Sequence, residues 1–462
     1  MKYKAEPNSP TVGAPSARRV KLMPRGYKVY SSYKDSGVEW LGDIPDEWIV
    51  KRSKYVFNEI NNRTATGEED LLSVSEYYGV KPRSSVMSSG EHLSRAESLV
   101  DYKKCSKDNL VINIMLAWKR GLGVSKYDGI VSPAYCVFKA ITPVEPYYMH
   151  DLFRTNLYTK RFKSKSTGVI DSRLRLYPEM FGTIETLLPP LQEQKSIANY
   201  LDKATTKIDT LIEKQTKLIA LLKEKRQAVI SSAVTRGLDA SVPMKDSGVE
   251  WLGEIPEGWK VSKITHYGEV TKLTGFEYTN KWKTTANGEI TALRGLNIKG
   301  RKLNLENTER ISMKLSRELR RSKLFSGDVV FPCTGTIGSA ALINSDDEFH
   351  INQNVAKITF NKTVFPMFGV YWMTSRFIKK TIDRNNMSGM QPVVLIGDIR
   401  KLPIPKLSLK EQEEIVFFLN KVTAKVDALI VKSSQIVDLL KEKRTALISA
   451  AVTGKIDVRD AA

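Results

Sequence analysis

The side chains that could do chemistry fall into two groups of loops, one in each half of the chain. They are basic, aromatic, hydroxyl and amide groups, the types that contact phosphates and base edges of DNA. In the first half they are Tyr77, Lys81 and Arg83 in "SEYYGVKPRS", Lys119 and Arg120 in "WKRG", and Ser166, Arg173 and Arg175 in "STGVIDSRLRLY". In the second half they are Arg294, Asn297, Lys299, Arg301, Thr334, Thr336, Asn352, Gln353, Asn385 and Gln391. Each alone is an ordinary surface residue, so the prediction of a DNA-binding site depends on their gathering in matching loops.

Motifs for catalysis are missing from the sequence. It contains no GxxxxGK[ST] phosphate loop, no GxGxxG turn and no Asn/Asp-Pro-Pro-aromatic tetrapeptide. No cysteine–histidine cluster has zinc spacing. The histidines are scattered along the chain, at His92, His150, His266 and His350. We therefore predict no catalytic residue, no metal site and no cofactor in this chain. Any chemistry would depend on partners.

Composition and charge narrow the class of protein. The chain has 462 residues, 41% of them hydrophobic, and is long enough for several domains. Lysine and arginine number 72 against 51 acids, a net charge of +21 that favours polyanions, above all nucleic acid. A merely soluble basic surface is the alternative on charge alone. We expect neither a membrane span nor a secretory signal, and the apolar surroundings of Cys105, Cys136 and Cys333 predict buried reduced thiols, as in a cytoplasmic protein.

Two repeats must position the candidate loops. "KDSGVEWLGDIPDEWIV" at 34–50 returns as "KDSGVEWLGEIPEGWKV" at 245–261, with differences only at positions 43, 46, 47 and 49. A longer segment that begins at Leu191 returns from Leu409, whereas the blocks between the repeats show little identity. The chain is thus a tandem duplication with a shared framework and two divergent blocks. The tryptophans around Ile-Pro are expected to anchor each block on the long segment, with a ligand role as the alternative.

The long repeats have the spacing of paired helices. Apolar residues follow a heptad pattern at matching positions of both copies. The predicted helix-pairing residues are Ile197, Leu201, Ile208, Leu211, Leu218 and Leu222, and Ile415, Leu419, Val426, Leu429, Ile436 and Leu440. Each helix would be about 67 Å long. A divergent block is too compact to carry the chain back over that length, so antiparallel pairing with approximate two-fold symmetry is expected. The alternative is that each helix packs only on its own block.

The divergent blocks share an order of predicted elements. Strand-like runs such as "NLVINIMLAW" and "GDVVFPC" precede a glycine-rich loop and two further strands. This order predicts an α+β fold with two globular domains joined by two long antiparallel coiled-coil helices. The expected organisation is a tail at 1–33, which the framework does not need and which can be disordered, a first domain at 34–190, a helix at 191–236, a linker and second domain at 237–408, a helix at 409–454 and a tail at 455–462.

The arrangement resembles the specificity (S) subunit of type I restriction-modification systems. The resemblance covers about residues 34 to 457, and rests on the two "KDSGVEWLG" phrases, on "LPPLQEQKSIANYLD" and "LSLKEQEEIVFFLN", and on the paired "LLKEKR" helix ends. It implies two target recognition domains, each reading one half of a split double-stranded DNA sequence, at a spacing set by the helices. It also implies partners: two modification subunits with S-adenosylmethionine and adenine N6-methyltransfer chemistry, and restriction subunits with ATP- and Mg²⁺-dependent translocation and cleavage, in a prokaryotic cytoplasm.

Two other classes of function stay open on the sequence alone. A coiled-coil scaffold could join two protein-binding domains, with incidental charge. Salt-dependent retention on duplex DNA would separate that class from a DNA reader, because phosphate contacts weaken steeply with salt. A self-sufficient DNA enzyme is the third class and would need motifs that are missing. The bases recognised do not follow from the sequence, because arginine and asparagine contacts are degenerate without a docked pose.

Overall fold

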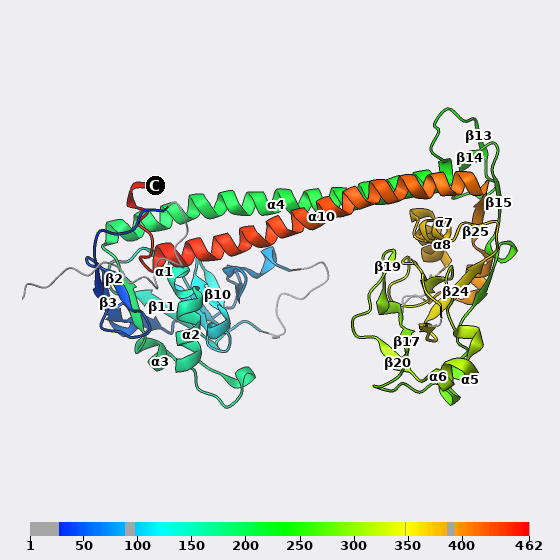
Figure 1. Ribbon diagram of the computed structural model, residues 1–462. Helices are drawn as coiled ribbons and strands as arrows, with labels where there is room; N and C mark the ends of the chain where they lie inside the picture. Colours follow the sequence, from blue (N-terminus) through cyan, green and yellow to red (C-terminus); the bar gives the residue numbers. More distant parts are fainter. Residues whose placement is uncertain (1–26, 88–97, 347, 386–392, 462) are drawn as a thin grey trace, which may run out of the picture. The chain divides into compact units, whose positions relative to one another are not determined.

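The computed structural model describes residues 27–87, 98–346, 348–385 and 393–461. The chain divides into two compact units (Figure 1). Unit 1 holds the chain up to Lys214 and from Ile436 onward, and unit 2 holds Gln215–Gln435. Each unit combines small sheets with helices, so the predicted α+β class is confirmed.

The core of unit 1 is built on a four-stranded antiparallel sheet. Its strands lie in the order β4 (Phe57–Ile60), β11 (Tyr135–Ala140), β8 (Leu110–Asn113) and β9 (Leu122–Val124). All four residues of β8 are buried, because side chains alternate between two covered faces. Leu110 and Ile112 face the helices, whereas Val111 faces a cluster from the smaller hairpins. These hairpins are β5 (Leu72–Ser75) with β6 (Gly79–Pro82), and β7 (Lys103–Cys105) with β10 (Gly129–Val131).

Three short helices cover the inner face of this sheet. They are α1 (Pro146–Phe153), α2 (Asn156–Lys165) and α3 (Pro178–Gly182). The first and third begin at a proline, whose missing N–H needs no partner in the first helical turn. Their aromatic side chains Phe153, Tyr158, Phe162 and Phe181 pack together in the core. Two further pairs complete the unit: β1 (Tyr33–Asp35) with β2 (Asp43–Pro45), and β3 (Ile49–Arg52) with β12 (Glu185–Leu188).

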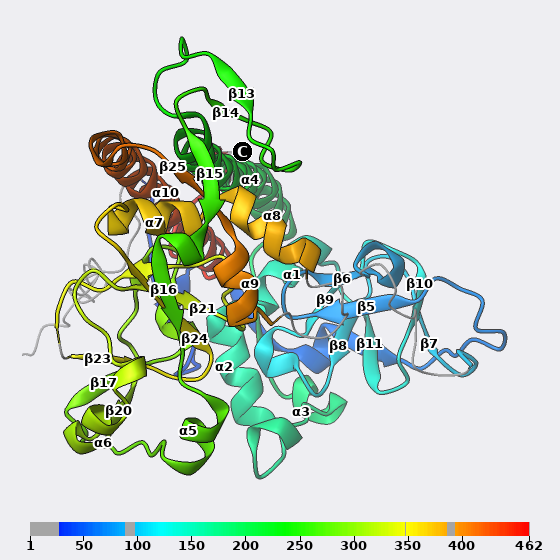
Figure 2. The same cartoon turned by 90° about the vertical axis from the view of Figure 1, so that its right-hand side faces the viewer.

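Unit 2 repeats this topology although its sequence has diverged. Its central sheet has the order β16 (Gly268–Thr271), β24 (Val355–Phe360), β21 (Val329–Pro332) and β22 (Ala341–Leu342). The helices α7 (Pro366–Met373), α8 (Arg376–Asn385) and α9 (Ile396–Lys401) follow in the same order as α1 to α3. The outer pairs are also repeated: β13 (Met244–Asp246) with β14 (Glu254–Pro256), and β15 (Lys260–Lys263) with β25 (Pro403–Lys406). Figures 1 and 2 show α7 beside the central sheet of this unit.

Unit 2 also carries elements that the described part of unit 1 does not match. A three-stranded mixed sheet has the order β20 (Glu309–Ile311), β17 (Ile290–Leu293) and β23 (Phe349–Ile351), with β17 and β23 parallel. A short hairpin follows, β18 (Ile298–Lys299) with β19 (Lys302–Leu303). The helices α5 (Gly275–Asn280) and α6 (Met313–Glu318) flank it in sequence. Unit 2 therefore combines this mixed sheet with an antiparallel central sheet.

The two long repeats form α4 (Leu191–Arg236) and α10 (Leu409–Val452), as predicted. In unit 1 the beginning of α4 packs beside the end of α10, because Ile197 and Leu201 share a core with Leu447 and Val452. In unit 2 the end of α4 packs beside the beginning of α10, where Val234 joins the core of Ile415 and Leu419. The two helices are therefore antiparallel in each unit.

Ion pairs between the helices support the same direction. In unit 1, Arg444 Nε donates to Asp209 Oδ1 at 2.9 Å. In unit 2, Arg226 pairs with Asp427. The predicted heptad pairing needs a correction at three positions. Ile197, Leu201, Ile208, Ile415, Leu419 and Val426 are buried and Leu222, Ile436 and Leu440 are half-buried, but Leu211, Leu218 and Leu429 are 47%, 42% and 51% exposed.

The physical reason is the helical repeat. A heptad stripe keeps facing its partner only as far as the two helices supercoil, because a straight α-helix drifts by about 20° per heptad relative to a strict seven-residue pattern. At the helix ends the globular domain also covers the stripe, whereas nothing in the described residues covers Leu211 to the same degree. Ile212, one position further on, packs against the unit 1 core instead.

The cysteines are free and buried in the described structure. Burial raises the pKa of the Cys105 and Cys333 thiols to about 11 and that of Cys136 to about 12, so they are inert thiols, as predicted. In the described part of the chain, no helix has the length and apolar character that crossing a membrane requires. Those residues also contain no group of three or more histidine, cysteine or acidic side chains placed to hold a metal ion.

Candidate nucleic-acid interface

Loops far apart in sequence meet at one end of the central sheet in unit 2. Thr336 Oγ1 donates to the carbonyl of Gly295 at 2.7 Å, and Ala340 N donates to that of Gly300 at 2.9 Å. Cys333 N donates to Asn354 O at 2.8 Å, which joins the "CTGTIG" loop to the "INQN" turn. The structure therefore brings together three of the loops that the sequence singled out in the second half.

Several candidate side chains in this cluster are already occupied. Asn297 is fully buried, and its amide binds Arg294 N, Asn304 O and Glu306 O. Arg294 pairs with Glu309 at 3.2 Å. These two residues hold the loop in shape rather than present free groups. Lys299 is exposed on the same loop.

Arg301 lies over an aromatic ring of α7. Its guanidinium is 5.0 Å from the centre of the Tyr371 ring and 3.9 Å from Asp427 Oδ2 on α10. Burial lowers the pKa of Arg301, and the tyrosine and the aspartate partly oppose that effect. Its charge is thus engaged with the helices of unit 2.

The other candidates in unit 2 are placed as follows. Thr334 forms an isolated antiparallel bridge with Val393, and its side chain is half-buried. Asn352 is buried and accepts a hydrogen bond from Asn354 N at 2.9 Å, whereas Gln353 beside it is half-buried. Asn385 ends α8. Gln391 lies outside the described residues.

In unit 1 a single arginine, Arg154, joins two candidate loops. Its guanidinium donates to the carbonyls of Ser75 and Glu76 in the β5–β6 turn, at 3.3 Å and 2.9 Å. It also donates to the carbonyls of Arg120 and Leu122, at 2.6 Å and 2.7 Å. Burial lowers the pKa of Arg154 to about 10, with a further contribution from Arg120. Because four carbonyls surround it, Arg154 fixes the turn that carries Tyr77 against the "WKRG" loop.

The side chains that these two loops present in unit 1 are basic and aromatic. Tyr77 is 84% exposed. Lys119 on the loop and Lys163 on α2 both place their ammonium groups 4.9 Å from the Trp118 ring. Arg120, in a left-handed conformation with φ 66°, donates to Asn156 Oδ1 at 2.6 Å. The sequence analysis missed Trp118 and Arg154, and the letters "WKRG" were the available signal for the first.

The remaining candidates of unit 1 lie on the "KPRS" and "STGVIDSRLRLY" segments. Lys81 is exposed, 5.5 Å from the Tyr78 ring, and Arg83 is half-buried. Arg173 is exposed, whereas Arg175 is half-buried and donates to the Leu174 carbonyl at 2.9 Å. Ser166 ends α2 by donating to Phe162 O at 2.7 Å. Leu176 N then donates to Ile114 O, which brings this segment to the "WKRG" loop.

Buried histidines support these loops. His150 Nδ1 accepts from Val124 N at 3.2 Å, and its ring fills the space beside Gly79 and Gly123. Desolvation lowers the pKa of His150 to about 3 and that of His350 to about 4. Both rings are therefore neutral and act in packing.

The repeated tryptophan phrase has the same role in both units. In unit 1, Trp48 is fully buried and donates its indole N–H to Glu193 Oε1 at 3.0 Å. In unit 2, Trp259 donates to Glu411 Oε1 at 2.9 Å. Each glutamate lies in the first turn of a long helix, where a negative charge is favoured. The prediction that the tryptophans anchor the blocks on the helices is thus supported for Trp48 and Trp259, whereas Trp40 bonds to Glu185 of β12 and Trp251 is 44% exposed.

We call each pair, Trp48 with Glu193 and Trp259 with Glu411, a tryptophan clamp. The residue that follows the glutamate in the helix completes each clamp. Gln194 accepts from Glu145 N at 2.9 Å and donates to Pro189 O at 2.8 Å. Gln412 accepts from Phe365 N at 2.8 Å and donates to Leu407 O at 3.1 Å. The glutamine therefore fixes the start of the first covering helix, α1 or α7, in each unit.

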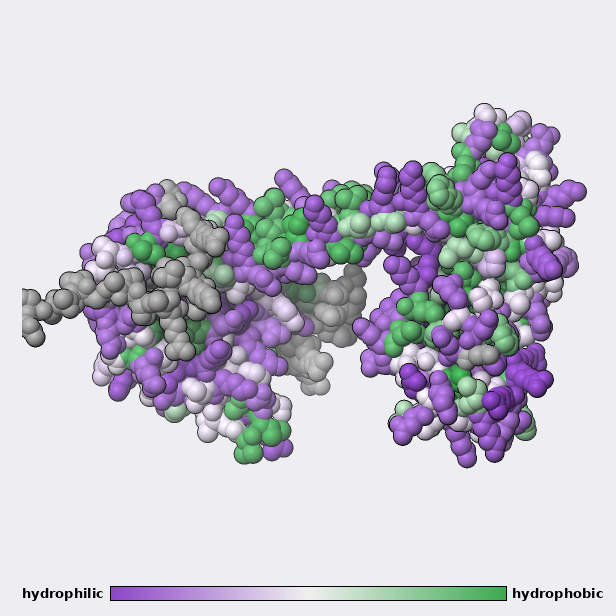
Figure 3. Space-filling model, in the orientation of Figure 1, coloured by the Kyte–Doolittle hydropathy of each residue, from purple (hydrophilic) through white to green (hydrophobic). Residues whose placement is uncertain are grey.

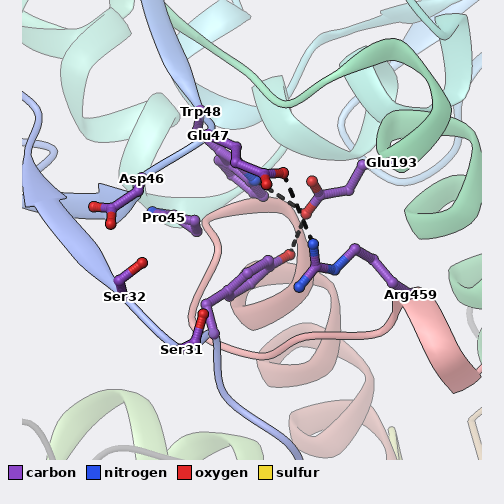
Figure 4. Close-up of a pocket in the computed structure, with 9 residues that line it drawn as sticks. Ser31, Ser32, Pro45, Asp46, Glu47, Trp48, Glu193 and Arg459 are labelled. Carbon is purple, nitrogen blue, oxygen red and sulfur yellow. Dashed lines mark hydrogen bonds and ion pairs between the residues drawn. The ribbon is translucent and has the colours of Figure 1, made fainter.

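In unit 1 the two ends of the described chain meet at this clamp (Figure 4). Tyr30 donates to Glu193 Oε1 at 2.6 Å, and the Arg459 guanidinium lies 5.1 Å from the Tyr30 ring. Lys28 and Asp457 form an antiparallel bridge. A small cavity of about 50 Å³ lies beside them. The described end of the N-terminal segment, for which the sequence indicated no role, is thus packed on the framework.

Comparison with known proteins accounts for this duplicated framework. Residues 256–436 match the family described as the type I restriction modification DNA specificity domain. The specificity subunit of the type I restriction enzyme StySPI from Salmonella potsdam is 22% identical over 439 residues, which cover 90% of each chain. The chain is therefore similar in sequence and in fold to type I specificity subunits.

Other relatives of this chain show how far the likeness extends. The EcoBI specificity subunit of Escherichia coli is 23% identical over 274 residues, and the match spans 58% of that protein. A chain solved in a study of complex assembly of the type I R-M system is 15% identical, covers 88% of this chain and 98% of its own, and has a TM-score of 0.66. The HsdS subunit of Thermoanaerobacter tengcongensis, with 15% identity and coverage of 89% and 98%, has a TM-score of 0.51. These two structures share the fold.

Proposed function

We propose that this chain is a type I specificity subunit that reads a bipartite DNA sequence, with one half-site contacted by the loops of each unit. The observation that carries the proposal is the convergence, in both units, of loops that follow equivalent strands. Leu176 N donates to Ile114 O in unit 1, and Val394 N donates to Cys333 O in unit 2. A shared frame that presents different side chains suits two readers of different sequences.

The charge of the chain supports DNA as the ligand. The net charge of +21 favours a polyanion, and Lys119, Arg173 and Lys299 are exposed on the candidate loops. Lys81 and Tyr77 are exposed on the β5–β6 hairpin. Basic groups of this kind contact phosphates, and amide or guanidinium groups contact base edges.

We further propose that the long helices set the spacing of the half-sites and dock two modification subunits. Exposed apolar side chains support docking, because an apolar surface patch commonly marks a site where another protein binds. In unit 2, Leu238, Phe417 and Phe418 line an open apolar groove of about 560 Å³, and Leu218 and Leu221 are exposed on α4. Figure 3 shows apolar, green atoms along the long helices.

The chemistry would then reside in the partners. The modification subunits would bring S-adenosylmethionine for adenine N6 methylation, and restriction subunits would bring ATP- and Mg²⁺-dependent translocation and cleavage. The complex would work in the cytoplasm, where its DNA is. In this proposal the present chain is non-catalytic and supplies sequence recognition and assembly.

The experiment is to sequence methylated adenines in DNA exposed to the assembled complex. The proposal predicts methylation within one split sequence, with two short specific halves around a spacer of fixed length. Salt-dependent binding of the purified chain to duplex DNA gives an independent check. A protein-binding scaffold would instead be favoured if the purified chain bound no DNA or bound it independently of salt, and if the methylated sequence did not depend on this chain.

A further inference from the structure

The exposed part of the repeated phrase forms the same hairpin in both units. Residues 33–45 form β1, a turn and β2, and residues 244–256 form β13, a turn and β14. The turn has the sequence Asp-Ser-Gly-Val-Glu-Trp-Leu-Gly in both copies. Figure 2 shows the β13–β14 hairpin standing away from the body of unit 2.

Turn geometry explains only part of this identity. Asp35 Oδ1 accepts from Gly37 N at 2.9 Å, and Asp246 Oδ1 accepts from Gly248 N at 3.0 Å. The glycines at 37, 42, 248 and 253 have positive φ, which favours glycine. Glu39 and Glu250, in contrast, are exposed side chains in the middle of the turn. An exposed charge of this kind has no part in the fold of the turn, yet it is identical in the two copies.

The tryptophan of the turn gives an independent observation. In unit 1, Trp40 donates to Glu185 Oε2 at 3.1 Å, and Arg161 lies over its ring. Glu185 begins β12, and the residue that begins the equivalent strand β25 is Pro403, which has no carboxylate. Trp251 is nevertheless kept in unit 2, where it is 44% exposed and the Arg384 guanidinium lies 5.8 Å from the centre of its ring. The hydrogen bond of unit 1 therefore does not explain why both copies have tryptophan.

Charge excludes the DNA backbone as the ligand of these hairpins. Each hairpin, 33–45 and 244–256, carries one lysine against three acids. The acids of both hairpins are exposed: Asp35, Glu39, Asp43, Asp246, Glu250 and Glu254. In a chain of net charge +21, these are local acidic surfaces with an aromatic centre. An acidic rim around an indole fits a basic protein surface with an apolar recess, and repels phosphates.

We propose that the two hairpins, residues 33–45 and 244–256, are equivalent docking surfaces that each bind one copy of the same protein, the modification subunit. Two surfaces with the same turn sequence, on a chain whose other loops have diverged, are what a partner present in two identical copies requires. This inference rests on the proposed function and adds the contact surface to it. Figure 3 shows apolar atoms among hydrophilic ones over the unit 2 hairpin.

The test uses the full chain reconstituted with its modification subunit and native mass spectrometry to count the copies bound. The variants are Glu39→Lys, Glu250→Lys and the double variant, because these exposed side chains can change without loss of the fold. Each single variant is expected to weaken one of the two bound copies about tenfold or more, and the double variant both. Trp251→Ala is expected to weaken one copy as well.

Matched controls are charge reversals at exposed acids outside the hairpins, Glu68→Lys in unit 1 and Glu306→Lys in unit 2. These should keep both copies at the original affinity. If the double variant also keeps both copies, the hairpin proposal is overturned while the proposed function stands. If one of the two single variants weakened a bound copy and the other did not, the two hairpins would not be equivalent. A native chain that binds no modification subunit at all would instead contradict the proposed function.

Discussion

Trp48 donates its indole N–H to Glu193 Oε1 at 3.0 Å, and so joins the first block of the chain to the first turn of α4. Trp259 and Glu411 repeat the bond at 2.9 Å in unit 2. The spacing between the partners differs in the two halves, because the second block is longer. The clamp is therefore a property of the framework that tolerates change in the block between its two residues.

Replacement of Trp48 by phenylalanine should loosen unit 1 alone. The change keeps most of the buried apolar surface but removes a hydrogen bond to a charged acceptor, which contributes about 1.5 to 3 kcal/mol. Hydrogen exchange measured by mass spectrometry should become faster in peptides of unit 1 and stay unchanged in peptides of unit 2. The matched variant Trp259→Phe should do the reverse. Equal effects of either variant on both units would contradict independent clamps.

Arg154→Met should damage recognition of one half-site. Removal of the guanidinium leaves four buried or half-buried carbonyls without that donor, at a cost of about 3 kcal/mol or more. Amide hydrogen exchange should become faster at residues 75–76 and 120–122. The affinity for DNA that carries the intact target sequence should fall. Discrimination against base changes should be lost in the half-site that unit 1 reads and kept in the half-site that unit 2 reads. Arg154→Lys should restore part of it, since one ammonium can reach some of the carbonyls.

Asn297 and Lys299 lie on one loop and should behave differently. Asn297→Ala removes a buried amide with three partners and should lower the stability of unit 2 by about 2 kcal/mol. Lys299→Ala should leave thermal stability unchanged, weaken DNA binding and reduce the slope of log affinity against log salt by about one. A loss of stability in the lysine variant, or an unchanged salt slope, would remove Lys299 from the interface.

The long helices should act as a spacer. An insertion of four residues in the exposed part of both α4 and α10 adds about 6 Å to each, or about two base pairs of DNA. The methylated sequence should keep both halves and gain a longer spacer. A four-residue insertion in the exposed loop 239–241 is the control and should leave the spacer unchanged. An unchanged spacer after the helix insertions would show that the helices do not set it.

The sequence predicted the framework better than the site, for physical reasons. Repetition identified α4, α10 and the tryptophan clamps, because their partners are repeated with them. Leu211 and Leu218 were predicted from a periodicity that cannot show where a helix leaves its partner. Arg154 was not found, because its partners are backbone carbonyls that lie up to 79 residues away and leave no pattern in side-chain types.

The candidate loops show the same limit at single residues. Asn297 has the amide that base reading needs, but the fold uses all of it internally. The shared order of elements in the two blocks was predicted, but the pairing of their strands was not, since a sheet needs only apolar residues at alternating positions and not particular ones. DNA contact by the exposed candidates, Tyr77 and Lys299 among them, stays a prediction.

Exchange of residues 262–400 for the corresponding block of another specificity subunit tests the central claim most directly. The measurement is the set of methylated adenines found by sequencing DNA exposed to the reconstituted complex. Two independent readers on one framework predict that one half of the split sequence changes, while the other half stays as before. A change in both halves, or in neither, would contradict that account.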